Sequence, residues 1–181
     1  TKVKPAISPN HRILDATTYS LYLWATMKIT NIKTYKFSVP TGLERRDPHS
    51  GKIIGSAQKG WLFLKIETDV GIDGWGEGSG EWLVDVAETT LHGWSELLEG
   101  QDPLRIAALT DDLSDRSPWK GGPVLGTAAA AVNMALHDIA GKAWGVPVHA
   151  ILGGKRRDRL RVYGNGGMVF DSPEAAVESA M

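Results

Sequence analysis

The clearest hydrophobic pattern of the chain lies in residues 127–154. Apolar side chains recur there at helical spacing and form one stripe, at Val132, Ala135, Leu136, Ile139 and Ala143. The alanine run at 128–131 precedes this stripe and favours a helix with a thin face, which suits close packing. Gly145 stands where a left-handed residue would end the helix, and Pro147 stands where a second short helix would open. We therefore predict a long buried helix on which the upstream elements pack.

Upstream of that helix, apolar and polar residues alternate as is typical of half-buried strands. The predicted strands cover residues 27–39, 61–68 and 73–78. The first has a break in register near Asn31, and a turn at 69–72 joins the second to the third. The apolar residues on one face of the second strand are Leu62, Leu64 and Ile66. Residues 40–60 are rich in charges, glycine and proline and are predicted to form a long loop, so the opening unit is a three-stranded antiparallel sheet.

Two amphipathic helices are predicted between this sheet and the long helix. The apolar stripe of the first consists of Val84, Ala87, Leu91, Trp94 and Leu98. Gly100 closes this helix, and Asp102 is expected to cap the next one with Pro103 at its first position. The inward-facing residues of the second helix are Ile106, Leu109 and Leu113. The pattern thus predicts helices packed on one face of the sheet.

The two ends of the chain differ from this central part. Residues 1–26 mix charge and proline without periodicity, and their apolar cluster at 19–25 has only the minimum length for a secretory signal. We expect Met27 to be the natural start and residues 1–26 to be a disordered extension. At the other end, 160–163 is predicted as a strand, and a helix is predicted to begin at Ser172-Pro173. This β-loop-α order suggests the first rung of a larger α/β structure that is truncated here.

Composition excludes several classes of function. A formal net charge of −1 over 181 residues gives no support for nucleic-acid binding. The absence of cysteine excludes disulfides, thiolate catalysis and Cys-type zinc sites. No apolar run approaches the roughly 20 residues that span a bilayer. We expect a soluble, cytoplasmic protein with neither nucleic acid nor membrane as a partner.

Two motifs that suggest chemistry have simpler explanations. The GWGEGSG segment at 74–80 does not match G-x-G-x-x-G, and its alternate glycines fit a strand end and a turn better than a nucleotide site. His137 and Asp138 are neighbours on the long helix, where consecutive side chains point about 100° apart. Asp138 can pair with Lys142 at i+4, and His137 then fits a packed or capping role. The other histidines show no metal-ligand spacing and are His11, His49, His92 and His149.

The charged segment 40–60 is the stronger candidate for a binding site. Its cations outnumber its acids by two, with Arg45, Arg46, Lys52 and Lys59 against Glu44 and Asp47. Long loops in compact domains are commonly functional lids, and an excess of cations suits an anionic ligand such as a carboxylate; the alternative is a merely solvated loop. A second stretch, 80–83, places an aromatic residue beside a carboxylate at a strand-to-helix turn. The candidate substrate-binding or lid residues are Arg45, Arg46, His49, Glu81, Trp82 and Lys120.

Several short motifs also occur in a familiar order along the chain. They are MKIT at 27–30, LKIETD at 64–69, GWGE at 74–77, KGGP at 120–123, ALHDIAGK at 135–142, LGG at 152–154 and RD at 157–158. In this order they resemble the amino-terminal capping domain of the enolase superfamily, in its mandelate racemase/muconate lactonizing enzyme branch. Within that branch the sequence is similar to galactonate dehydratase and related acid-sugar dehydratases.

This resemblance implies an α+β capping domain over 27–154, with a three-stranded antiparallel sheet plus a helical bundle. It is followed by the first β/α unit of a truncated TIM-like barrel over 155–181, where Tyr163 and Gly164 would end the first barrel strand. In the family, barrel carboxylates bind Mg²⁺, which stabilises the enediolate formed when a base removes the proton α to a carboxylate; dehydratases then expel a β-hydroxyl. The cap loops, here 40–60 and 78–83, shield the site and help to select the substrate. No catalytic residue and no metal ligand can be assigned in this chain.

Three functions remain open at this point. The first is the front part of a Mg²⁺-dependent acid-sugar dehydratase, a carbon–oxygen lyase whose partner is a small sugar acid. The second is the same part of a racemase, epimerase or cycloisomerase of the superfamily. The third is a non-catalytic binding or interaction module. We expect the protein to be a homo-oligomer.

Overall fold

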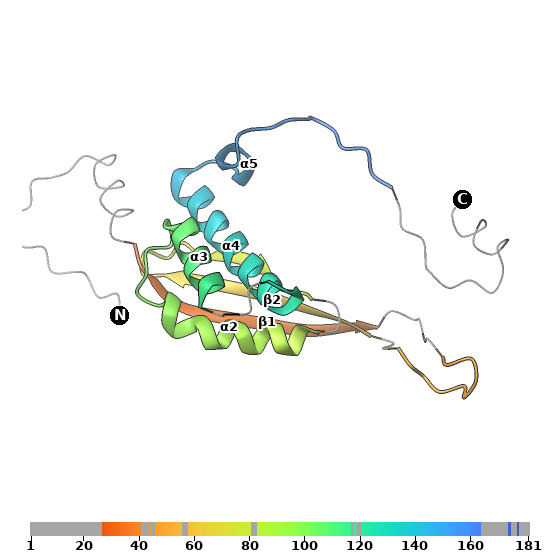
Figure 1. Ribbon diagram of the computed structural model, residues 1–181. Helices are drawn as coiled ribbons and strands as arrows, with labels where there is room; N and C mark the ends of the chain where they lie inside the picture. Colours follow the sequence, from red (N-terminus) through yellow and green to blue (C-terminus); the bar gives the residue numbers. More distant parts are fainter. Residues whose placement is uncertain are drawn as a thin grey trace, which may run out of the picture.

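The computed structural model describes residues 27–40, 44, 46–55, 58–80, 83–116, 118, 121–163, 174 and 177. Its strands are β1 (Ile29–Pro40), β2 (Gln58–Thr68) and β3 (Gly74–Glu77). Its helices are α2 (Val84–Leu98), α3 (Ile106–Asp115), α4 (Pro123–Trp144) and the short α5 (Val148–Ile151). The helices lie on one face of the sheet, which makes two layers (Figure 1). This is the α+β architecture that the sequence predicts.

The sheet is antiparallel with the strand order β1-β2-β3. The predicted break in β1 is confirmed, since the register shifts between Ile29 and Asn31. The predicted extent of the loop at 40–60 is wrong at both ends, because β1 and β2 stay paired as far as Pro40 and Gln58. Proline is tolerated there because β1 is an edge strand, where a missing N–H does not cost a ladder hydrogen bond. The connection between the strands is therefore shorter than the sequence suggests.

The core lies between the sheet and helix α4. The three predicted core residues of β2 are completely buried and are Leu62, Leu64 and Ile66. Helix α4 lies directly on β3, where a Cβ atom placed on Gly76 would be 1.9 Å from the carbonyl oxygen of Ala131, and one on Gly74 would be 2.0 Å from that of Ala135. The alternate glycines of the GWGE motif therefore let two backbones touch. This function of the motif agrees with the non-nucleotide interpretation and with the predicted thin alanine face of the helix.

The two helices between sheet and α4 match the predicted stripes with one correction. Helix α2 buries Ala87, Leu91, Trp94 and Leu98 as predicted. The prediction that Asp102 caps the next helix is wrong, since α3 begins at Ile106. The Asp102 carboxylate instead accepts a hydrogen bond from the Leu104 N–H (2.9 Å), which forms a separate turn, and buried Pro103 lies within it. Asp102 thus makes the hydrogen bond of a helix cap, but in a turn that precedes α3.

Helix α4 starts earlier than the alanine run, at Pro123, and ends as predicted. Gly145 has the left-handed conformation (φ 66°), and its N–H closes the helix on carbonyls of the last turn. Pro147 lies directly before α5 rather than inside it. The predicted strand at 160–163 is wrong: these residues pair with no described strand, and Val162 is 84% exposed. A barrel strand is held by hydrogen bonds to neighbouring strands, and no neighbour for it occurs among the described residues.

Several predictions fall on residues that the structure does not describe. Residues 1–26, with their apolar cluster, lie outside the described residues, as does Gly164. Of the segment predicted as a helix after Ser172-Pro173, Glu174 and Val177 are described, and both are helical. Within the described part of the chain, no helix is both long and apolar enough to cross a membrane.

Candidate functional site

The connections that follow β1 and β3 lie towards the same end of the sheet. Because neighbouring strands are antiparallel, the end of β1, the start of β2 and the end of β3 share this end. It therefore carries the described part of the β1–β2 connection, residues 46–55, and the segment that follows β3 at Gly78 (Figure 1). The start of α4 lies at the same end, since a Cβ atom on Gly80 would contact the side chain of Thr127 at 3.5 Å. The segment after β3 therefore lies beside the first turns of α4, whereas the β1–β2 hairpin projects beyond the end of β3.

The connection between β1 and β2 has a folded tip of its own. Arg46 and Ile53 form an antiparallel bridge, and the Asp47 N–H donates to the Lys52 carbonyl (2.7 Å). Within the tip, the Asp47 carboxylate accepts hydrogen bonds from the Ser50 N–H (2.6 Å), the Ser50 hydroxyl (2.8 Å) and the His49 N–H (3.0 Å). The two Ser50 bonds above all lower the pKa of Asp47, because they favour its charged form. The described part of this connection is therefore an ordered turn rather than a structureless loop.

Two of the predicted site residues are described, and both lie in this tip. The Arg46 guanidinium is paired with the Glu44 carboxylate and donates to the Gly51 carbonyl (3.2 Å), so its charge is already compensated. The side chain of His49 is exposed. The other predicted site residues lie outside the described residues and are Arg45, Glu81, Trp82 and Lys120. Lys59 belongs to β2 and not to a loop, which corrects the predicted excess of two cations there.

The segment after β3 is anchored by a residue that the sequence analysis missed. The Ser79 hydroxyl accepts a hydrogen bond from the Leu62 N–H (2.9 Å), and the Gly78 N–H donates to the Leu62 carbonyl (2.8 Å). Ser79 thus continues the ladder with its side chain where β3 has ended. A serine directly after an alternating strand is the only sequence signal for this role, and it is weak.

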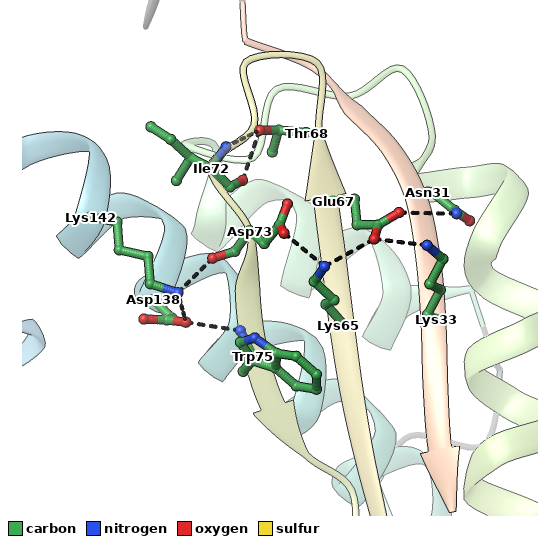
Figure 2. Close-up of polar contacts among 10 residues, drawn as sticks. All are labelled: Asn31, Lys33, Lys65, Glu67, Thr68, Ile72, Asp73, Trp75, Asp138 and Lys142. Atoms are coloured by element: carbon green, nitrogen blue, oxygen red, sulfur yellow. Dashed lines mark hydrogen bonds and ion pairs between the residues drawn. The ribbon is translucent and has the colours of Figure 1, made fainter.

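An ion-pair network occupies the opposite end of the sheet (Figure 2). The Lys65 ammonium lies 2.7 Å from Asp73 and 3.0 Å from Glu67, and Lys33 lies 2.8 Å from the same Glu67 carboxylate. Hydrogen bonds from Lys33, then Lys65, lower the pKa of Glu67 to about 2, and those to Asp73, then Glu67, raise the pKa of Lys65. All these charges are compensated, so the network suits structural support and leaves no free general base.

A second polar cluster ties β3 to helix α4. The predicted pair between Asp138 and Lys142 is confirmed at 2.7 Å. The same Asp138 carboxylate accepts from the Trp75 N–H (2.9 Å), and the Lys142 ammonium donates to the Asp73 carbonyl (2.6 Å), as Figure 2 shows. His137 donates from Nδ1 to the Asn133 carbonyl of its own helix (2.9 Å), which fits the predicted packed role. These partners of His137 and Asp138 lie in α4 and β3.

The network predicts how stability depends on pH. Glu67→Gln removes a carboxylate whose pKa falls from 4.5 to about 2 on folding. The folded state binds fewer protons there than the unfolded state, so this stabilisation is present above pH 4.5 and is lost as pH falls towards 2. The free energy of unfolding of the parent chain, measured in urea, should therefore fall as the pH is lowered from 4.5 towards 2. The same free energy should depend less steeply on pH in the E67Q variant. If the free energy of unfolding of E67Q depended on pH as steeply as that of the parent, this role of the network would be contradicted.

The described residues do not fit a metal site. No group of three or more His, Asp or Glu side chains within the described ranges is arranged to hold an ion. Mg²⁺ requires near-octahedral oxygen coordination with well-placed carboxylates. The acids that are described in the tip, Glu44 and Asp47, bind Arg46 and the turn instead.

Comparisons with known proteins identify the family of this domain. The family model described as mandelate racemase / muconate lactonizing enzyme, N-terminal domain, matches residues 33–153. A D-galactonate dehydratase from Variovorax paradoxus is 48% identical over 103 residues, which are 57% of this chain and 27% of that protein. A D-galactonate dehydratase from Pectobacterium atrosepticum is 42% identical over 137 residues, which are 76% of this chain and 31% of that protein. The chain thus spans under a third of the length of these curated relatives.

Solved structures point to the same family. An enolase from Pantoea ananatis, described with bound D-gluconate and Mg, matches with a TM-score of 0.60 and 30% identity over 73% of this chain and 28% of that one. A structure described as a putative isomerase from Sinorhizobium meliloti matches with a TM-score of 0.62 and 30% identity over 73% of this chain and 37% of that one. Together with the family model, they show that the chain belongs to the mandelate racemase / muconate lactonizing enzyme family of the enolase superfamily, as its amino-terminal capping domain.

Proposed function

We propose that this chain is the capping part of an acid-sugar dehydratase, a lyase that removes water from a hydroxy acid such as galactonate. The observation that carries the proposal is the 42% identity to a D-galactonate dehydratase over 137 residues, which are 76% of this chain. In this reaction a base removes the proton α to the carboxylate, and the β-hydroxyl leaves as water. The chain's own contribution is to cover the reacting groups and to help select the substrate.

The fold supports that contribution by its geometry. Both lid segments lie at one end of the sheet, and each is held by its own hydrogen bonds: the tip through Asp47, and the segment after β3 through Ser79. A lid of this kind excludes water from the reacting groups and fixes the substrate in place. Mg²⁺, named in the description of the Pantoea ananatis structure, would be held by residues other than those described here.

The proposed function predicts the class of substrate. The protein expressed from the full reading frame that contains this chain should dehydrate one or a few acids in a library of aldonates and aldarates, detected as a carbonyl product. Uncharged sugars of the same stereochemistry are the matched control and should not react, because elimination requires the acidic proton α to a carboxylate. Turnover of uncharged sugars alone would contradict the proposal.

One observation favours a second candidate. The similarity to the putative isomerase from Sinorhizobium meliloti is consistent with racemisation or epimerisation, which begins with removal of the same proton. The same library incubated in D₂O distinguishes the two. An isomerase incorporates deuterium at the α carbon without loss of water, whereas a dehydratase forms the carbonyl product.

A further inference from the structure

The face of the sheet that points away from the helices carries a band of aromatic side chains. We define the outer aromatic face as Tyr35, Phe37, Trp61, Phe63 and Trp75. The rings of Phe37 and Phe63 stack with centroids 5.7 Å apart, those of Trp61 and Phe63 at 6.4 Å, and Tyr35 lies 5.2 Å from Trp75. Three of these side chains are between 43% and 49% exposed although they are large and apolar. Contiguous apolar patches of this kind mark interaction sites.

Two uncompensated charges of opposite sign flank this band. The Lys59 ammonium lies 4.4 Å from the Trp61 ring centroid, and Glu77 lies directly opposite Phe63 in the ladder and so on the same face. Neither Lys59 nor Glu77 forms an ion pair with another described residue. The other lysines of this face, Lys33 and Lys65, are already held by acids.

The register places these two charges symmetrically about Trp61. Lys59 precedes Trp61 by two residues, and Phe63, whose partner is Glu77, follows it by two. Each charge is therefore about 7 Å from Trp61 along the strand, on opposite sides, at roughly 3.4 Å per residue. Glu77 is offset to the side by one strand spacing of about 4.8 Å. That offset is within the reach of a lysine side chain.

From this arrangement we propose that the outer aromatic face binds a second copy of this chain, face to face, about a two-fold axis that crosses the strands at Trp61. The axis brings Lys59 of each copy to the level of Glu77 in the other, which forms two identical ion pairs. Between them, the Phe37 and Trp61 rings of one copy meet the same rings of the other. A two-fold interface requires such self-complementarity.

The face is smaller than a standard stable interface. Its five aromatic side chains expose roughly 300–500 Å² per copy, given the area of about 150–250 Å² that each can bury. A standard stable interface buries about 800 Å² per partner. The pairing should therefore be reversible, with a dissociation constant in the micromolar range or weaker.

Charge reversal tests the proposal on the 181-residue chain. Sedimentation equilibrium from about 1 µM to about 1 mM should show a monomer–dimer equilibrium in the parent chain. K59E and E77K should each weaken dimerisation by about tenfold or more, because each places like charges together at both ion pairs. An equimolar mixture of the K59E and E77K chains should restore association as a heterodimer, since both pairs then recover opposite charges. The double variant K59E/E77K should also dimerise like the parent.

The controls and contrary results are specific. Glu96→Lys reverses an exposed charge on α2, away from this face, and should leave dimerisation unchanged. Far-UV circular dichroism of each variant should match the parent, because both substituted side chains are exposed. A parent chain that stays monomeric over the whole concentration range would overturn the proposal. A dimer whose dissociation constant is unchanged by the single charge reversals would overturn it as well. So would single variants that fail to associate when mixed. In either case the face would bind a different partner.

Discussion

Gly76→Ala is expected to destabilise the domain by roughly 1–3 kcal/mol or more. The added Cβ atom would lie 1.9 Å from the carbonyl oxygen of Ala131, which is backbone within the long helix and has no rotamer through which to move away. Either β3 or α4 must shift, and overpacking of this kind costs roughly 1–3 kcal/mol or more. The shift would also pull the Asp138 carboxylate from the Trp75 N–H. Chemical denaturation of the variant measures the loss.

A glycine in the same helix provides the matched control for this substitution. Gly126 lies in α4, and a Cβ atom there would have nothing within 4 Å. Gly126→Ala should leave stability unchanged or raise it by about 0.5–1 kcal/mol, because alanine favours the helix. If G76A and G126A behaved alike, close contact between α4 and β3 would not be the reason for glycine at position 76.

Leu136→Ala is expected to cost roughly 2–5 kcal/mol, through lost transfer free energy and the cavity that remains. Leu136 is completely buried in the centre of α4, in the cluster that includes Leu64 and Leu91. Since single domains are stable by only about 5–15 kcal/mol, the variant should unfold at much lower denaturant concentration.

Met134 lies on the same helix and is 43% exposed. Met134→Ala should therefore change the free energy of unfolding by less than about 0.5 kcal/mol. A loss below about 1 kcal/mol for L136A would mean that this stripe does not face the core, and the predicted helix orientation would be wrong.

The elements that the sequence determined are those that depend on local pattern. The stripe on α2 and the stripe on α4 follow from helical spacing, and the left-handed end at Gly145 follows from the lack of a side chain there. The three antiparallel strands and the register break after Ile29 follow from alternation. The ion pair between Asp138 and Lys142 needs only the geometry of a single helix.

The candidate site could be predicted only in part. The sequence indicated two lid segments, and the structure places both towards the same end of the sheet, with only the segment after β3 beside α4. The sequence could not indicate that Glu44 compensates the charge of Arg46. It also could not indicate that Ser79 anchors the second segment on Leu62. The outer aromatic face was missed as well, because its aromatics occur on three separate strands, and only the strand register makes them neighbours.

The remaining features were decided by tertiary structure. The composition of residues 40–60 suggests a loop, yet β1 and β2 stay paired as far as Pro40. They do so because each strand provides backbone hydrogen-bond partners for the other. The same dependence explains residues 160–163: a strand-like pattern without a neighbouring strand does not form a strand. Gly76 is required because Ala131, distant in sequence, brings its carbonyl oxygen to that point. Spacing along one segment determines its type and its buried face, whereas its length and its contacts depend on which other segment lies against it.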